Sequence, residues 1–513
     1  MESMVPEGLN KQPVDVIASR IAALGFNCVR LTWATFMFTN STYGQRTVTD
    51  SFLGLGLNKT LVEIAAHNPS LLSLTVLDAQ KAVVDALGKA GVMVVLDNHV
   101  SLPQWCCAEN DGNGFFGDIY FDPKVWKRGL RIVAGRYRGN PAVVGVGLRN
   151  ELRGPHQSQP VWYQNVKRGV RAIHKANPDV LAMVSGMSYG TDLSFLLQKP
   201  LHPDNSTSLE KKIVYEAHWY SFTNGKHNDW SNFSPTWVCA DLTATFEKMI
   251  GAPVAAMNAP LFIGEFGIDF RALNRGDLRF LPCFNKLAAE RDLDWAIWAL
   301  QATYYRRNDI VDMEETFGVL DQTWYQTKDL NFMTKYRLLQ DTLQVVVPST
   351  GTTTNNAASQ YYIIYHPWTG LCLQASKDQS TVQLSDCKDR SRWSYESEGT
   401  PIKLVGTNLC LRSSGGGGGG GGNTPPATLS SNCTDLPSKW SQVPSGFKVQ
   451  IATTDEAGAL QCLDYYANST NSSSPTPTSA SVFTRQCVCL EGKLCYDSNP
   501  QSQWFLLISS NIA

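Results

Sequence analysis

Two glutamates follow short apolar runs in the first two thirds of this 513-residue chain. Glu151 ends the stretch 143–151, Val-Val-Gly-Val-Gly-Leu-Arg-Asn-Glu, and Glu265 ends the stretch 261–265, Leu-Phe-Ile-Gly-Glu. Short runs of this kind are typical of buried parallel strands, so each carboxyl group is expected just past a strand. Two facing carboxyl groups can act as proton donor and nucleophile, which is the chemistry that cleavage of a glycosidic bond requires. A single carboxylate after a strand is more often a cap or a loop residue, so only the pair supports this interpretation.

The elements that must position these glutamates show a repeating pattern. Up to about residue 346, apolar runs alternate with amphipathic stretches, which is typical of a parallel sheet with crossover helices. The predicted strands are Phe26–Trp33, Val92–Asp97, Ala142–Leu148, Val180–Val184, Lys212–His218, Leu261–Gly264 and Asp294–Ala299. The predicted helices are Val14–Leu24, Leu77–Lys89, Pro123–Tyr137, Val161–Lys175, Val238–Ile250, Pro282–Arg291 and Phe332–Leu343. The pattern predicts a (β/α)8 TIM barrel whose functional groups lie at the strand ends.

The pattern yields seven strands where a closed barrel has eight. We expect the first strand to be missing, as if an upstream signal peptide and first strand had been cut away. The chain as written is then expected to fold poorly, and a longer product to be active. The alternative is a true seven-stranded or open sheet.

Six further side chains fall at or near the predicted strand ends, in the order Arg30, His99, Asn150, His218, Tyr220 and Trp298. With Glu151 and Glu265, this series resembles glycoside hydrolase family 5, the cellulase family. The segments 8–15, 105–107, 111–117 and 298–301 resemble the plant branch of that family, which adds a ricin-type domain.

The resemblance implies a role for each residue. It makes Glu151 the general acid/base, Glu265 the nucleophile and Asn150 a donor to the sugar 2-OH. His99, His218 and Tyr220 would form a hydrogen-bonding wall, Arg30 would keep the nucleophile ionised, and Trp298 would lie under the sugar. The structural alternatives are an ion pair for Arg30, core histidines for His99 and His218, and packing at the barrel mouth for Trp298.

The composition changes after residue 346. Residues 347–360 are rich in Ser, Thr, Gly, Asn and Pro and are predicted to be a linker. Beyond it, Leu-Cys-Leu at 371–373 and 409–411 and Gln-Cys-Leu at 461–463 are each followed by a second cysteine and then a tryptophan. Three such units resemble a ricin-type β-trefoil that binds carbohydrate, although the Gln-x-Trp signature is absent from them. The predicted domains are therefore residues 1–346, a barrel, and 361–513, a trefoil.

Cysteines and sequons favour an oxidising compartment. Eight of the 13 cysteines follow position 370, and N-glycosylation sequons start at Asn40, Asn58, Asn205, Asn432, Asn468 and Asn471. We therefore expect a secreted, cell-wall protein, although no signal peptide is visible in this chain. Cys106 and Cys107 are expected to pair with Cys28, Cys239 or Cys283 in a connectivity that the sequence leaves open.

Charge and motifs exclude other classes. The chain holds 44 Lys and Arg against 45 Asp and Glu without a basic stripe, which argues against nucleic acid. No apolar run is long enough for a membrane span. We predict no metal and no cofactor, and a monomer.

The sequence therefore predicts a retaining hydrolase of β-linked glucan or mannan polysaccharide with a lectin domain. A catalytically inactive carbohydrate-binding protein and a transglycosylase are the alternatives.

Overall fold

The computed structural model describes residues 2–203, 207–271, 275–340, 343–344, 361–389, 391–414, 425–445, 448–465, 480–488, 490 and 501–512. The chain divides into two compact units, each described by itself. The first comprises Met1–Asn224, Ala244–Asn274 and Leu293–Lys328, and the second Gly225–Thr243, Arg275–Asp292 and Asp329–Ala513. The predicted linker, 347–360, lies outside the described residues, so the proposed domain limits stay predictions.

The first unit is built on one parallel sheet whose strands follow one another in chain order. They are β1 (Cys28–Ala34), β2 (Met93–Val100), β3 (Val143–Gly147), β4 (Leu181–Ser185), β5 (Ile213–His218), β6 (Leu261–Phe266) and β7 (Asp294–Ile297). Each overlaps a predicted strand. The sheet coils into a nearly closed TIM-like barrel, in which β1 and β7 come into contact without forming a described hydrogen-bonded register. The predicted TIM-type architecture is confirmed, with seven strands in the described sheet.

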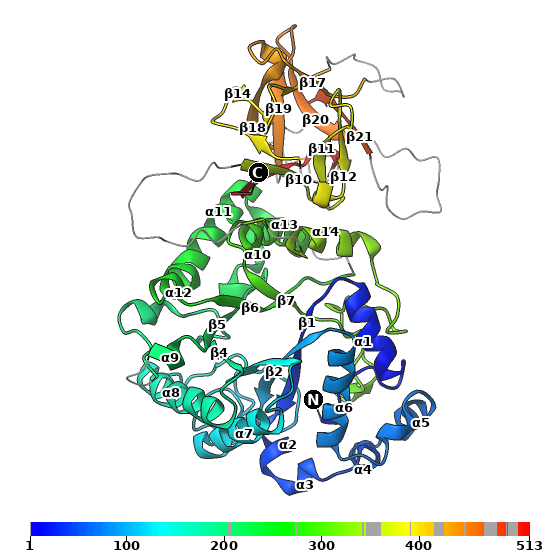
Figure 1. Cartoon of the computed structure of the whole chain (residues 1–513), viewed down its shortest axis with the longest axis vertical. Helices are drawn as coiled ribbons and strands as arrows, with labels where there is room; N and C mark the ends of the chain where they lie inside the picture. Colours follow the sequence, from blue (N-terminus) through cyan, green and yellow to red (C-terminus); the bar gives the residue numbers. More distant parts are fainter. Residues whose placement is uncertain are drawn as a thin grey trace. The chain divides into compact units, whose positions relative to one another are not determined.

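Helices lie outside this sheet, with α1 against α6 and α7 against α8 (Figure 1). The longer ones are α1 (Val14–Ala23), α5 (Asn58–His67), α6 (Val76–Lys89), α7 (Pro123–Arg136) and α8 (Gln159–Ala176). Their buried residues recur at helical spacing, as Val83, Val84 and Leu87 do in α6. Shorter helices are α2 (Thr35–Thr39), α3 (Ser41–Gly44), α4 (Val48–Gly54), α9 (Thr207–Glu210), α12 (Ala252–Ala256), η1 (Pro69–Leu71), η2 (Ser194–Leu197), η3 (Thr223–Gly225) and η4 (Glu247–Gly251). The sequence patterns missed the helices between β1 and β2 other than α6.

The N-terminal segment before α1 is buried rather than free. Leu9 is almost fully buried, and its amide donates to the Tyr305 hydroxyl at 3.1 Å. That hydroxyl in turn donates to the Pro6 carbonyl at 2.7 Å. Gly8 has φ +89°, and a side chain there would collide with the Trp324 ring. Only glycine fits this position, because it combines positive φ with close contact.

The second unit holds a 13-stranded antiparallel sheet and helices α10 (His227–Asn232), α13 (Arg275–Glu290) and α14 (Leu330–Gln340), while α11 (Pro235–Phe246) crosses the division. The strands are β10 (Tyr361–His366), β11 (Leu371–Ala375), β12 (Val382–Ser385), β13 (Trp393–Ser394), β14 (Thr400–Pro401), β15 (Lys403–Leu404), β16 (Cys410–Arg412), β17 (Thr428–Ser430), β18 (Lys439–Ser445), β19 (Lys448–Thr454), β20 (Leu460–Tyr465), β21 (Ala480–Gln486) and β22 (Leu506–Ser510). Short 3-10 turns occur at η5 (Cys387–Asp389), η6 (Leu436–Ser438) and η7 (Gln501–Gln503), and a two-stranded ribbon in the first unit joins β8 (Arg306–Arg307) and β9 (Ile310–Val311).

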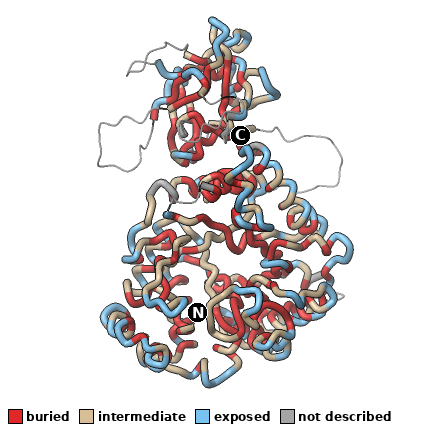
Figure 2. Tube along the Cα trace, turned by 180° about the vertical axis from the view of Figure 1, so that it is seen from behind, coloured by how far each residue is buried: buried red, intermediate tan, exposed pale blue. Residues whose placement is uncertain are grey.

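Two of the three sequence repeats make the same internal contact. The indole N–H of Trp393 donates to the Leu373 carbonyl at 3.2 Å, and that of Trp440 donates to the Leu411 carbonyl at 2.8 Å. Both tryptophans lie in one buried cluster with Leu373 and Leu411. Figure 2 shows this buried interior as a red core. The repeat is therefore structural, whereas the trefoil topology stays a prediction.

The disulfides differ from the predicted pairing in the first unit and follow the sequence repeats in the second. Cys106 and Cys107 are bonded to each other, and Cys239 is bonded to Cys283, so the predicted cross-pairing of the adjacent pair is wrong. Among the described cysteines Cys28 is free. In the second unit the repeat cysteines pair within each repeat, as Cys372–Cys387, Cys410–Cys433 and Cys462–Cys487. The described helices include none long and apolar enough to cross a membrane.

Candidate active site

The eight predicted site residues all belong to the first unit, and all except Arg30, which lies within β1, lie at or just past the carboxyl ends of its strands. Arg30 lies on β1, His99 on β2, His218 on β5 and Glu265 on β6. Asn150 and Glu151 follow β3, Tyr220 follows β5 and Trp298 follows β7. His218 and Glu265 are direct neighbours across the sheet. Because parallel strands end at one rim of a barrel, residues far apart in the sequence meet there.

Arg30 is the centre of the site. Its guanidinium donates to Glu216 Oε1 and Glu265 Oε1, each at 2.8 Å, and to Asn150 Oδ1 at 2.7 Å. Its Nη2 also lies 3.1 Å from Asp97 Oδ1. With only 5 % of its side chain exposed, Arg30 is a buried cation that neutralises part of an acidic cluster. It also fixes one oxygen of Glu265.

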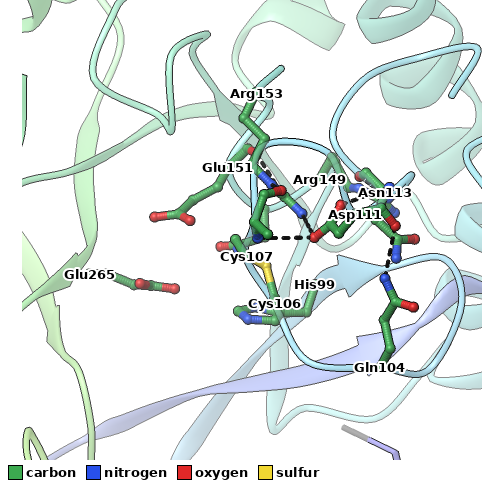
Figure 3. The surroundings of a disulfide bond; sticks show 12 residues. His99, Gln104, Cys106, Cys107, Asp111, Asn113, Arg149, Glu151, Arg153 and Glu265 are labelled. Atoms are coloured by element: carbon green, nitrogen blue, oxygen red, sulfur yellow. Dashed lines mark hydrogen bonds and ion pairs between the residues drawn. A yellow bond between two sulfur atoms is a disulfide. The ribbon is translucent and has the colours of Figure 1, made fainter. Parts of the chain in front are cut away.

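His218 lies between the two glutamates. Its Nδ1 is 3.0 Å from Glu151 Oε1 and 3.6 Å from Glu265 Oε2. One carboxylate oxygen of each glutamate and one ring nitrogen of His218 lie within 4.8 Å of one another. Figure 3 shows the two carboxyl groups pointing into the same space. The geometry thus brings the predicted pair together.

The remaining predicted residues surround this pair. The Tyr220 hydroxyl donates to Glu265 Oε2 at 3.0 Å, so both oxygens of Glu265 are held by hydrogen bonds. His99 is 2.7 Å from Asp97 Oδ2 through Nδ1, and its ring stacks parallel to Trp298 with centroids 5.7 Å apart. The rings of His99 and Trp298 are therefore held parallel to each other at the site.

Two buried acids of this network were missed. Asp97 and Glu216 lie two residues before His99 and His218 on the same strands, and each is at most 2 % exposed. Alternate residues of a strand point to one side, so this spacing was a readable signal that the acid and the imidazole share a face. Gly264 makes room for Glu216, because a side chain at 264 would collide with Glu216 Oε1.

The two glutamates differ in their pKa values. Burial raises the pKa of Glu265, and the positive charges of His218 and Arg30 offset this only in part. Burial also acts on Glu151, but the hydrogen bond and charge of His218 outweigh it and lower the pKa. The pKa of Glu265 is therefore raised and that of Glu151 lowered. The sequence predicts the reverse, with Glu151 as the protonated carboxyl group.

His218 carries the proton instead. Burial lowers its pKa, but the negative charges of Glu265, Glu151 and Glu216 outweigh that cost and raise the pKa to about 10. Three acceptors around one imidazole favour its charged form, so the ring is an imidazolium at neutral pH.

Two groups of side chains at this rim have the spacing of metal ligands. Glu151, His218 and Glu265 form one, but a protonated imidazole has no free lone pair to offer a metal. His99, Cys106 and Cys107 form the other, but their sulfur atoms are joined in a disulfide and are not thiolates. Neither group therefore has the donors of a metal centre as it stands.

Comparison with protein families identifies the cellulase family. The model of the cellulase family, glycosyl hydrolase family 5, matches residues 6–303. A glycosyl hydrolase 5 family protein from Chamaecyparis obtusa is 40% identical over 526 residues, covering 100% of this chain and 88% of the relative. The major extracellular endoglucanase of Xanthomonas campestris is 25% identical over 304 residues, covering 55% of this chain and 57% of that protein.

Solved structures share the barrel fold. An endocellulase from Pyrococcus horikoshii, solved with cellotetraose, aligns with a TM-score of 0.51 and 19% identity. The alignment covers 66% of this chain and 89% of the endocellulase. At this identity the likeness concerns the fold alone.

Proposed function

Because the chain belongs to the cellulase family, glycosyl hydrolase family 5, we propose that it cleaves β-linked glucan chains with retention of configuration. The observation that carries the mechanism is the approach of Glu151 and Glu265 to within 4.8 Å between carboxylate oxygens. Retaining enzymes place their carboxyl groups about 5–5.5 Å apart, whereas inverting enzymes leave about 6.5–9.5 Å for a water molecule. The spacing therefore favours direct attack by a carboxylate.

In the first step Glu265 attacks the anomeric carbon while Glu151 protonates the departing glycosidic oxygen. The bond to that oxygen breaks as the bond to Glu265 forms, which leaves a glycosyl ester on the enzyme. In the second step Glu151 removes a proton from water, which attacks the same carbon and releases Glu265. Two inversions at one carbon give net retention.

The surrounding network suits these roles. Arg30 and Tyr220 donate to different oxygens of Glu265 and so fix the attacking carboxylate. His218 holds a proton 3.0 Å from Glu151, so the proton for the leaving oxygen is available within the His218–Glu151 pair. Asn150 supplies an amide beside Glu151 for the sugar 2-OH, and the stacked rings of His99 and Trp298 supply a flat face for a sugar.

The relatives give support for a substrate class and a location. An extracellular endoglucanase is among them, which supports β-glucan over mannan and supports secretion, and we propose the cell wall as the destination. The described sequon residues Asn40, Asn58 and Asn432 are exposed, as glycosylation requires. The repeats of the second unit support a carbohydrate-binding trefoil, and we propose residues 361–513 as its limits.

The test is release of reducing sugar from β-glucan, glucomannan and mannan by the wild type and by Glu151→Gln and Glu265→Gln. Loss of the nucleophile is expected to lower kcat by roughly 10³-fold or more, and loss of the acid/base by about 10²–10⁴-fold. Azide is expected to rescue Glu265→Ala with the inverted glycosyl azide as product, since removal of the side chain leaves room for a small anion in place of the carboxylate. Binding of polysaccharide without any cleavage by the wild type would instead support the inactive lectin.

A further inference from the structure

The disulfide between Cys106 and Cys107 lies against the candidate active site. Its sulfur atoms are 3.7 Å and 3.6 Å from Asn150 Nδ2, and each lies with a His99 ring nitrogen in a group spanning at most 4.8 Å. Figure 3 shows the sulfur pair above His99, beside the space into which Glu151 and Glu265 point. Both cysteines are partly exposed.

Asn150 is held differently at its two ends. Its Oδ1 accepts a charged hydrogen bond from Arg30 at 2.7 Å, which fixes the oxygen toward the arginine. Its Nδ2 faces only the two sulfur atoms among the described residues. Sulfur is a weak acceptor, so both amide protons are left nearly free for a stronger acceptor such as a sugar hydroxyl.

The loop that carries the disulfide is anchored to the segment that carries Asn150. Arg149 donates to Ser101 Oγ at 3.1 Å and to the Asn113 carbonyl at 2.7 Å. On the other side of Asn150, Arg153 donates to the Ala108 carbonyl at 2.9 Å.

A second set of bonds closes the loop on itself. Arg153 also pairs with Asp111 at 2.5 Å, and Gln104 donates to the Asp111 carbonyl at 2.9 Å. Both arginines are at most 2 % exposed. The buried arginines Arg149 and Arg153 thus hold the disulfide loop in a fixed position relative to the Asn150 amide.

We infer that the Cys106–Cys107 disulfide is a substrate-positioning element that orients the Asn150 amide toward the sugar and forms the wall beside it. This inference rests on the proposed function, because it assigns the ligand of Asn150 to the sugar bound at the two glutamates. An apolar, weakly accepting wall holds the amide in place without competing with the sugar hydroxyl for its protons.

The test is a double-mutant cycle between Cys106→Ala/Cys107→Ala and Asn150→Ala, assayed on 4-nitrophenyl β-cellobioside. Removing the disulfide is expected to lower kcat/KM by about 10-fold or more, because small errors of position are costly in a reacting site. In the Asn150→Ala background the same removal is expected to change kcat/KM by less than about 3-fold, because the two changes act through one contact. A purely structural role would lower activity equally in both backgrounds.

A matched control removes another disulfide. Cys239→Ala/Cys283→Ala is expected to lower the melting temperature and to leave kcat/KM within about 2-fold of wild type. Additive losses in the cycle, or full activity after loss of Cys106 and Cys107, would overturn the inference while leaving the proposed function intact.

Failure of the proposed function is distinguished by a binding measurement. Cellotetraose is titrated calorimetrically into Glu265→Gln with and without the disulfide, each with Asn150 and with Asn150→Ala. If the wild type cleaves no β-glucan, a weaker affinity after loss of the disulfide, seen only when Asn150 is present, still supports the inference. Equal affinities, or no binding, would overturn it.

Discussion

At the residue scale, the site has fewer cationic side chains than carboxyl groups, and this imbalance determines its electrostatics. Arg30 contacts Asp97, Glu216 and Glu265, and His218 contacts Glu151, Glu216 and Glu265. Two cationic side chains therefore hold four buried or partly buried carboxyl groups. Removing either cation leaves an unpaired charge in a medium that solvates it poorly, so both positions are expected to matter for stability as well as for activity.

The geometry of Arg30 matters beyond its charge. Arg30→Lys keeps the charge but cannot donate at once to Glu216, Glu265 and Asn150, as the planar guanidinium does. The expected result is a fall in kcat/KM of roughly 10²-fold on soluble β-glucan, with the protein still folded by circular dichroism. Arg128→Lys, at an exposed position on α7, is the control and should retain activity. Full activity of Arg30→Lys would show that charge alone suffices.

His218 links stability to pH. Because its pKa is raised to about 10 in the folded protein, against about 6.5 when unfolded, its contribution to folding is complete below about pH 6.5. That contribution declines as the pH rises and is lost once the pH passes about 10. Thermal denaturation of wild type and His218→Gln should therefore differ most at pH 6 and least at pH 10.5. A difference independent of pH would contradict a charged His218.

At the scale of elements, the site depends on strands that end in register and on helices that pack closely behind them. Trp126 of α7 shows this, because its indole N–H donates to the Leu148 carbonyl at 2.7 Å, three residues before Glu151. Gly169 of α8 lies against the same ring, where an added Cβ would be 2.6 Å from Trp126 Cη2. The contact between α7 and α8 thus reaches the segment that carries the acid/base candidate.

Gly169→Ala is expected to destabilise the first unit by about 1–3 kcal/mol, because the close packing leaves no room for a methyl group. Gly135→Ala in α7 is the matched control, since its nearest neighbour would be 4.0 Å away. An alanine in an open helical position is expected to stabilise by roughly 0.5–1 kcal/mol. Denaturant unfolding measures both changes, and equal effects of the two substitutions would rule out this account of α7–α8 packing.

At the scale of the whole molecule, the two units are stabilised by different means. The first is built on a parallel sheet with helices, whereas each repeat of the second is closed by its own disulfide. All eight proposed site residues belong to the first unit, so chemistry and the proposed carbohydrate binding of the repeats are expected to be separable.

Opening one repeat tests this separation. Cys410→Ser/Cys433→Ser is expected to destabilise the second unit by about 3 kcal/mol, because a disulfide restricts the unfolded chain. Calorimetry should show a lower-temperature transition, while hydrolysis of 4-nitrophenyl β-cellobioside at 25 °C stays unchanged. Cys28→Ser, which removes a free thiol of the first unit, controls for the substitution itself. A parallel loss of hydrolysis would show that the two units depend on each other.

The sequence by itself determined the order of the barrel strands, the repeats of the second unit and the positions of the eight candidate residues. It could do so because burial on a strand and on a helix leaves a local pattern, and because functional groups of a barrel follow its strands. Each of the seven strands, for example, is indicated by an apolar run of only a few residues.

Only the tertiary structure decided which of these residues touch. Arg30 and Glu265 are 235 positions apart, and nothing local to either one specifies their 2.8 Å contact. The bond between Cys239 and Cys283, the ion pairs of Arg30 with Asp97 and Glu216, and the proton on His218 likewise depend on what packing brings near. A pKa and a disulfide partner are properties of an environment assembled from distant segments, and so they appear only when the chain is folded.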